Sequence, residues 1–321
     1  MDVILHLGAH RTASTSFQAY MRGNADQLAA HGIGFWGPWR TRNGLFNGVI
    51  PTPGRISDER QYRLASGRIA LACAKTAKSG MRQLVVSDEN MLGAPRQNLR
   101  ADCLYPDAAP RLVNYLSAFG GGVERIVLSI RSPDYYWASC LAFAVARGHA
   151  LPDAARLTAL SQSRRGWRAV ICDIASVAPA VPILVMTHEE FGGMPERRLW
   201  LMTGQRILPP MTHARQWLNR SPDLDHLRRS LRDRAAPTPE TTVTLPEGQG
   251  RWMPFNKHQQ AAMREHYADD LFWLRAGADG LATLAEETGH HIGQAGPNPP
   301  PNELTRGRQD DKQTGRMVSN R

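Results

Sequence analysis

The chain has 321 residues, of which 42% are hydrophobic and 21% charged, a balance typical of a globular protein with one large domain or two small ones. No apolar run approaches the roughly 20 residues that a membrane helix needs, and no signal peptide pattern is visible, so we expect no membrane span. The formal charge is +10, but the basic residues are scattered and not interleaved with aromatics, which favours an anionic substrate over nucleic acid.

Short apolar runs alternate with helix-forming stretches through the first 190 residues. Residues 3–7 are apolar and end at Gly8, which predicts a strand followed by a loop, and a helix begins near residue 14. Further strands are predicted at 83–87, 124–130 and 181–187, and helices at 61–78, 109–119, 133–147 and 166–177. This alternation predicts an α/β three-layer sandwich, similar to P-loop NTPases, with a mainly parallel central sheet.

The remaining segments differ in composition from this core. Residues 36–55 are rich in Gly, Pro, Asn and Arg, which indicates a long loop. After residue 195 the chain is mainly helical, with a loop at 237–254 and a last helix at 256–288. The polar tail 294–321 is rich in Pro and Gly and is predicted to be disordered. We therefore expect one α/β domain at 1–293 and a tail at 294–321.

The four cysteines, at positions 73, 103, 140 and 172, are too far apart for a CxxC metal or redox motif. Free, buried thiols are typical of proteins from a reducing compartment. We therefore expect a cytoplasmic protein with no metal site.

The segment from Gly8 to Ser16 has the composition of an anion-binding loop. A strand enters, Gly8 permits a tight turn, and hydroxyl residues open a helix, so that backbone N–H groups and a helix N-terminus face an anion. The residues expected at this anion are Gly8, Arg11, Thr12, Ala13, Ser14, Thr15 and Ser16. The Walker A pattern GxxxxGK[ST] fails, because Ala13 and Ser14 stand where it requires Gly and Lys.

The loop resembles the 5′-phosphosulfate loop of sulfotransferases that use 3′-phosphoadenosine 5′-phosphosulfate (PAPS), commonly written GxxKTGTT. In this chain it is Gly8-Ala9-His10-Arg11-Thr12-Ala13-Ser14-Thr15. Arg11 replaces the family's lysine, which contacts the bridging oxygen as the sulfuryl group leaves. Arg11 keeps the positive charge but does not readily give up a proton. Ala13 replaces a glycine and is expected to adopt an ordinary backbone conformation, and Ser14 keeps the hydroxyl of the family's threonine.

A second motif follows the predicted strand 124–130. Arg131, a Pro133-Asp134 turn and Ser139 resemble the 3′-phosphate element of the same family, with the family's spacing of eight residues from arginine to serine. An arginine at the carboxyl end of a strand can hold a phosphate through two hydrogen bonds, and parallel sheets bind their ligands at that end. A looser similarity is Gly248-Gln249-Gly250-Arg251-Trp252, where Arg251 would reach the 3′-phosphate and Trp252 would stack on adenine.

The resemblance implies an enzyme that transfers a sulfuryl group from PAPS to a hydroxyl or amine of an acceptor, a carbohydrate or a small molecule, without a metal. Such a transfer needs a general base. Glu89 is the first candidate, because it follows the strand 83–87 beside Asp88, and His10 in the loop is the second, with His188 as a further possibility. Arg11 completes the expected catalytic residues.

The acceptor would contact the loop 36–55 and the aromatic cluster at 135–137. Arg40, Arg42 and Arg55 of that loop would attract an acidic glycan, or they are solvated charges.

Three other functions fit part of the sequence. A P-loop kinase would share the fold, with Asp88 at Mg²⁺, but the Walker lysine is missing. A catalytically inactive sulfotransferase-like binding protein fits Arg11 and Ala13. A basic nucleic-acid-binding protein fits the net charge and would bind with a steep salt dependence.

Overall fold

The computed structural model describes residues 1–204, 207–234 and 245–286. The predicted tail 294–321 and the predicted domain end at 293 lie outside these residues. In the described ranges, six strands form one all-parallel sheet in the order β2-β3-β1-β4-β5-β6. Their bounds are β1 Asp2–His6, β2 Ile33–Trp36, β3 Gln83–Ser87, β4 Val123–Ile130, β5 Ile183–Thr187 and β6 Thr283–Leu284. The predicted α/β architecture is confirmed.

Strand β1 lies at the centre of the sheet because both of its faces are apolar. It pairs with β3 from Asp2 opposite Gln83 to His6 opposite Ser87, and with β4 on its other side. Val3 and Leu5 belong to one hydrophobic cluster and Ile4 to another. Successive side chains of a strand point to opposite faces, so a continuous apolar run is buried on both faces of a parallel sheet.

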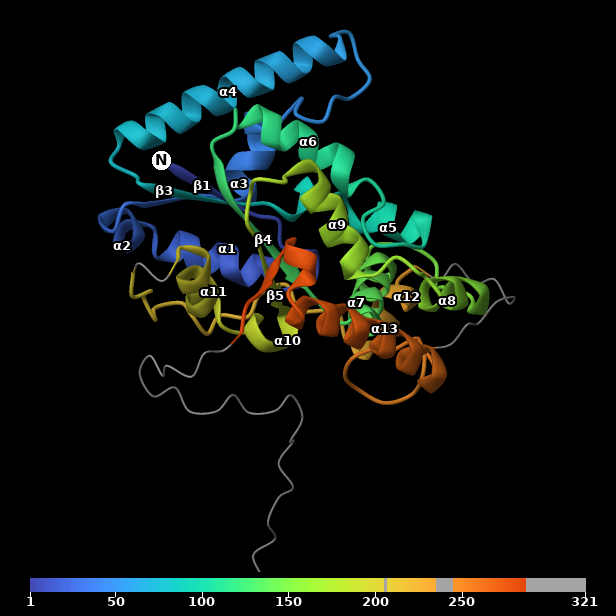
Figure 1. Cartoon of the computed structure of the whole chain (residues 1–321). Coiled ribbons are helices and arrows are strands. Elements are labelled where there is room, and N and C mark those ends of the chain that lie inside the picture. Colours follow the sequence, from blue (N-terminus) through green and yellow to red (C-terminus); the bar gives the residue numbers. More distant parts are fainter. Residues whose placement is uncertain (205–206, 235–244, 287–321) are drawn as a thin grey trace, which may run out of the picture. The chain divides into compact units, whose positions relative to one another are not determined.

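Helices cover both faces of the sheet and complete three layers (Figure 1). One face carries α4 (Asp58–Lys78), α6 (Ala108–Ala118) and α9 (Trp167–Val177), which contact one another in that order. The other face carries α1 (Ser14–Gly23), α2 (Ala25–Ala30) and α11 (Pro195–Met202), with α1 against α11.

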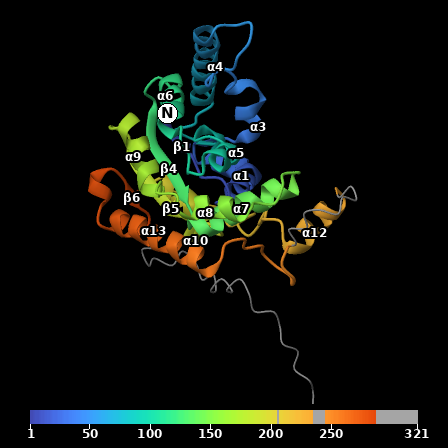
Figure 2. The ribbon, with the colours of Figure 1, turned by 90° about the vertical axis from the view of Figure 1, so that its right-hand side faces the viewer.

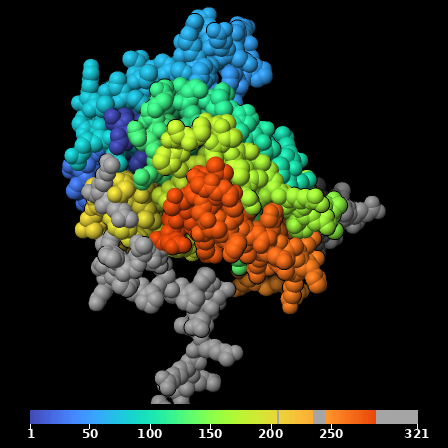
Figure 3. Space-filling model, in the orientation of Figure 1, coloured from blue at the N-terminus to red at the C-terminus, as the bar shows by residue number. Residues whose placement is uncertain are grey.

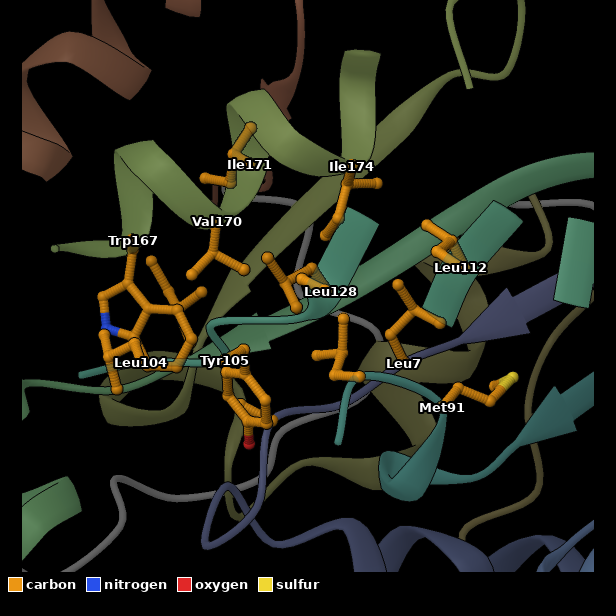
Figure 4. Close-up of a cluster of buried hydrophobic side chains, with 14 of the residues drawn as sticks. Leu7, Met91, Leu104, Tyr105, Leu112, Leu128, Trp167, Val170, Ile171 and Ile174 are labelled. Atoms are coloured by element: carbon orange, nitrogen blue, oxygen red, sulfur yellow. The ribbon is translucent and has the colours of Figure 1, made fainter. Parts of the chain in front are cut away.

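The larger core lies between the sheet and α4, α6 and α9. Figure 4 shows Leu7 and Leu128 from the sheet side facing Val170 and Ile174 of α9. Tyr105 lies in the same cluster with its ring among the apolar side chains and its hydroxyl directed away from them. Burying this much apolar surface is the main stabilising contribution to the fold.

The remaining helices gather at one end of the sheet, onto which Figure 2 looks. They are α5 (Pro95–Ala101), α7 (Pro133–Ala146), α8 (Ala154–Ser161), α12 (Leu224–Arg232) and α13 (Lys257–Arg275). Helix α7 packs against α12 and α13, and α13 continues along α9 (Figure 3). The short helix α3 (Pro38–Arg40) follows β2, and α10 (His188–Phe191) follows β5 and contacts α11.

Two predicted boundaries were wrong. The last helix was predicted to reach residue 288, but α13 ends at Arg275, and the chain then forms β6 at the edge of the sheet. The predicted loop 36–55 contains α3 and a π-turn at Thr41–Leu45, and its first residue ends the unpredicted strand β2. No helix within the described residues is long and apolar enough to cross a membrane.

Candidate functional site

The sequence motifs meet at one edge of the sheet. Strands β1, β3, β4 and β5 run parallel, so the segments that follow them emerge side by side at their carboxyl ends. These segments are the loop 8–13, the turn at 88–91, the start of α7 and the short helix α10. The expected residues of both motifs therefore lie in one region, as the fold of a parallel sheet requires.

The loop 8–13, called the phosphate loop below because the sequence predicts that it binds a phosphate, begins at Gly8, whose conformation excludes a side chain. Its φ is +30°, and a Cβ there would lie 2.8 Å from Cε1 of the buried His6 ring. The loop is held to the sheet by the Ala9 N–H, which donates to the Ser129 carbonyl at 3.0 Å. Gly8 thus lets the backbone pass directly over His6.

Ala13 does not have the ordinary backbone conformation that the sequence predicts. Its φ is 61° and its ψ is 26°, in the left-handed region, and Arg11 also has a positive φ of 66°. Left-handed residues with a Cβ are uncommon because the Cβ approaches the carbonyl oxygen. The backbone therefore keeps the conformation that suits the glycine of the GxxKTGTT pattern, although the residue is alanine.

The hydroxyls of the loop are bonded to neighbouring groups. Thr12 Oγ1 donates to the Ala9 carbonyl at 2.5 Å, and Ser14 Oγ donates to the same carbonyl at 3.5 Å. Ser16 Oγ accepts from the Leu218 N–H at 2.8 Å, and Thr15 Oγ1 accepts from Asn219 Nδ2 at 3.3 Å. Residues 218–219 thus lie against the start of α1, a contact that the sequence did not predict.

Arg11 of the loop and Ser139 of α7 are in direct contact. Arg11 Nε donates to Ser139 Oγ at 2.7 Å, and the Arg11 guanidinium lies 5.1 Å from the ring of Phe143. Arg131 NH1 donates to the Arg11 carbonyl at 2.8 Å. Ser139 Oγ also bonds Ser221 Oγ at 3.1 Å. The two motifs, about 120 residues apart in sequence, form one cluster.

Arg131 is 7% exposed and its Nε has no hydrogen-bond partner. The guanidiniums of Arg131 and Arg251 lie 5.7 and 5.1 Å from the ring of Tyr135. Burial and the charges of Arg251 and Arg11 lower the pKa of Arg131 to about 10, against the opposing effect of Glu189. Three arginines therefore share one site whose nearby carboxylate is Glu189.

Glu189 has structural partners of its own. Its two carboxylate oxygens accept from the Ser132 N–H at 2.9 Å and the Tyr267 hydroxyl at 3.0 Å. Trp252, which was expected to stack on adenine, is 5% exposed and belongs to the main core, so its ring is covered by protein. The structure therefore brings Arg251, and not the ring of Trp252, to the open side of this cluster.

Glu89 is held as an ionised carboxylate. Arg42 NH2 lies 2.9 Å from Glu89 Oε1 and 2.7 Å from Asp88 Oδ1, and Gln18 Nε2 donates to Glu89 Oε2 at 3.0 Å. Burial alone would raise the pKa of Glu89, but the protonated form of His10 and the charge of Arg42 outweigh it and lower that pKa. Arg42 is therefore the ion-pair partner of this turn, although 40% of its side chain is exposed.

His10 is bonded at both ring nitrogens. Nε2 lies 3.1 Å from Asn90 Oδ1, an acceptor, and Nδ1 lies 3.0 Å from the Tyr105 hydroxyl, which also accepts from the His10 N–H at 2.8 Å. These partners fit a neutral ring with its proton on Nε2. Burial lowers the pKa of His10 more than the charge of Glu89 raises it, so the ring is neutral at pH 7.

One basic residue beside the loop, the buried Arg198, was missed in the sequence, and another, the partly buried His188, was given little weight. Arg198 of α11 is 1% exposed and contacts His6 and Ser129 beneath the loop. His188 has no partner at Nδ1, and burial together with the charges of Arg131 and Arg198 lowers its pKa to about 3. The position of His188 directly after a predicted strand indicated that it lies at the site. Arg198 lies in a helix with no motif around it, so nothing in the sequence indicated its place there.

The described residues contain no group of three His, Cys, Asp or Glu side chains that would hold a metal ion. Comparisons with protein-family models, curated proteins and solved structures found no match for this chain. What is established is an α/β protein with a six-stranded parallel sheet and a cationic cluster at the carboxyl ends of its strands.

Proposed function

We propose that this chain binds PAPS and transfers its sulfuryl group to a hydroxyl or amine of a carbohydrate or small-molecule acceptor. The observation that supports this most is the contact between Arg11 and Ser139, backed by Arg131. It unites the two motifs that resemble the 5′- and 3′-phosphate elements of sulfotransferases.

The donor set fits a phosphorylated nucleotide. Arg131 has a buried Nε without a partner, and Arg11 and Arg251 add charge beside it. A phosphate dianion would accept from these guanidiniums and relieve their mutual repulsion. Arg131, Ser139 and Arg251 would hold the 3′-phosphate, and the N–H groups of the loop would hold the 5′ group.

The chemistry that PAPS supplies is transfer of a sulfuryl group, with the 3′,5′-bisphosphate as leaving group. A side chain of the protein must then remove the acceptor's proton while the acceptor oxygen or nitrogen bonds to sulfur. His10 suits this role better than Glu89, because His10 is neutral at pH 7 whereas Arg42 and Gln18 already stabilise the Glu89 carboxylate. Arg11 would stabilise the charge that develops on the leaving group.

An inactive nucleotide-binding protein is the second candidate. Both nitrogens of His10 and both oxygens of Glu89 are engaged within the protein, which favours this alternative. A kinase is disfavoured, because the Asp88 carboxylate that would hold Mg²⁺ accepts from Thr41, Arg42 and the Asn90 N–H.

The test is a calorimetric titration with 3′-phosphoadenosine 5′-phosphate, the expected product, beside ATP with Mg²⁺. We expect the bisphosphate to bind and ATP not to, and Arg131→Ala or Ser139→Ala to weaken binding by about 1–3 kcal/mol. Arg168→Ala is the matched control, because Arg168 stacks on Trp273 away from the loop. Preference for ATP, with no effect of either substitution, would contradict the proposal.

A screen of PAPS with phenols, amines and oligosaccharides then distinguishes an enzyme from a binding protein. Sulfuryl transfer to any acceptor supports the enzyme. Tight bisphosphate binding with no turnover across the whole screen supports the inactive protein.

A further inference from the structure

Arg198 is the most deeply buried arginine at the candidate site, with an exposed fraction of 1%. It lies in α11, which packs against α1, the helix that follows the phosphate loop. Its guanidinium lies 4.9 Å from the ring of Phe17 in α1. An arginine is seldom buried to this extent unless its charge has a counterpart.

The bonding partners of Arg198 within the described part of the chain are all neutral. NH2 donates to Ser129 Oγ at 2.9 Å and to His6 Nε2 at 2.8 Å. Because Nε2 accepts, the His6 proton is on Nδ1 and is donated to Ser87 Oγ at 2.8 Å. The Nε of Arg198 has no partner. The burial lowers the pKa of Arg198 to about 9, so it remains charged at pH 7.

The other end of the guanidinium faces the backbone of the phosphate loop. NH1 lies 3.5 Å from the carbonyl oxygens of both Thr12 and Ala13. In a trans peptide the C=O and N–H point in opposite directions. Carbonyls that are drawn toward Arg198 therefore direct the N–H groups of Ala13 and Ser14 to the opposite side, where the loop would hold an anion.

We propose that Arg198 is a positioning residue of the phosphate loop, which orients the loop's N–H groups and supplies the buried positive charge that an anion bound there neutralises. The ligand class is a phosphate or phosphosulfate group. The inference rests on the proposed function only in requiring an anion at this loop, so it holds for any ligand that carries one.

The experiment compares three probes on the full chain. They are 3′-phosphoadenosine 5′-phosphate, inorganic pyrophosphate, and adenosine 3′-monophosphate, which lacks the 5′ group. In Arg198→Met we expect the Kd of the first two to rise at least tenfold and that of adenosine 3′-monophosphate to change less than twofold. Arg198→Lys, which keeps the charge but has one nitrogen in place of the guanidinium fork, recovers part of the loss.

Arg125→Met is the matched control. Arg125 also donates to backbone carbonyls, those of Leu201 and Met202 at the end of α11, at 3.3 and 3.0 Å. It lies at the start of β4, away from the loop, so we expect all three Kd values to match the wild type. If Arg198→Met and Arg125→Met raise the Kd values equally, the role of Arg198 is merely structural and the inference is overturned.

The remaining outcomes separate this inference from the proposed function. Equal weakening of all three probes in Arg198→Met, or no weakening, overturns the role of Arg198 and leaves the proposed function intact. If the wild type binds pyrophosphate but not the bisphosphate, the proposed function fails, and the pyrophosphate Kd of Arg198→Met decides the inference. If the wild type binds neither probe, both are overturned.

Discussion

Residue by residue, the phosphate loop combines one obligatory glycine with a left-handed alanine. Gly8 must lack a side chain because the His6 ring lies 2.8 Å from the position of its Cβ. Ala13 has a φ of 61°, a conformation that is costly for a residue with a Cβ. The loop therefore retains strain at position 13 that a glycine would remove.

Ala13→Gly is expected to stabilise the protein. Relief of the left-handed conformation gains about 1–2 kcal/mol, and the greater freedom of glycine in the unfolded chain takes back about 0.5–1 kcal/mol. Urea unfolding should therefore show a net gain of up to about 1.5 kcal/mol. Ala9→Gly is the control, because Ala9 is fully buried and is not among the residues of positive φ. It should destabilise, and a loss of stability in Ala13→Gly would contradict the prediction.

The general base is tested by its pH dependence. If His10 accepts the acceptor's proton, it must be neutral to act, and its lowered pKa keeps it neutral to below pH 6.5. Turnover should then rise with pH through a pKa below 6.5 and stay level above it. His10→Asn should lower kcat by about 10²–10⁴-fold, and Glu89→Gln by less.

The exposed His31 serves as the control for that series, and His31→Asn should turn over as the wild type does. A larger loss in Glu89→Gln than in His10→Asn would assign the base to Glu89. The measurement is sulfuryl transfer to the acceptor that the screen yields.

Among the elements, α9 and α13 together hold the arginine cluster in place. Asp270 of α13 is 4% exposed and accepts from the Trp167 N–H, at the start of α9, at 2.7 Å. Trp167 in turn donates from Nε1 to the Arg131 carbonyl at 2.7 Å. A side chain from a distant helix thus caps α9, and the first residue of α9 fixes the backbone of Arg131.

Asp270→Ala should destabilise the protein by about 1–2 kcal/mol, because it removes a helix cap and leaves the buried Trp167 N–H without a partner. It should also weaken binding of the bisphosphate, since Trp167 positions Arg131. Asp269→Ala is the matched control, because Asp269 is exposed and precedes Asp270 in the same helix. Unfolding in denaturant and a titration measure the two effects, and equal results for both variants would contradict the role of Asp270.

The elements also show where sequence patterns are sufficient. The predicted strands at 3–7, 83–87, 124–130 and 181–187 correspond to β1, β3, β4 and β5, each a central strand with a continuous apolar run. The missed strands β2 and β6 are the two edges of the sheet, with four and two residues. Segments this short have no readable periodicity, and pairing with a neighbour decides their structure.

The sequence likewise predicts some residues of the candidate site and not others. Arg11, Arg131 and Ser139 could be placed together because each follows or faces the end of a parallel strand, which topology brings to one edge. Arg198, Asn90 and Tyr105 could not, because their positions depend on how α11 and the segments after β3 pack in three dimensions. The conformation of Ala13 was predicted wrongly, because residue type alone does not reveal a backbone that the surrounding loop imposes.

For the whole molecule, histidines that are neutral in the folded state connect stability to pH. His6 is fully buried, His10 lies in the phosphate loop, and His188 follows β5. Burial lowers the pKa of all three, and the charge of Arg198 lowers that of His6 further. Protonating any of them places a positive charge beside Arg198, Arg131 or Arg42. The repulsion between these like charges destabilises the folded state.

The sign follows from the protons bound in each state. In the unfolded chain these histidines have pKa values near 6.5, above their folded values, so between the two the unfolded state binds more protons. The stability is fully present above about pH 6.5 and is lost as pH falls below it. For His188, with a folded pKa of about 3, the loss between pH 6.5 and 5 is about 2 kcal/mol.

Urea unfolding between pH 7.5 and 5 measures this loss, and the window excludes Glu89, whose lowered pKa places its own contribution below pH 4.5. His188→Gln removes one titrating group, so its stability should fall with pH by about 2 kcal/mol less than that of the wild type over this range. Parallel profiles for the two proteins would show that His188 is not buried in its neutral form. A bound anion should also flatten the wild-type profile, because it compensates the charge of a protonated histidine beside the arginines.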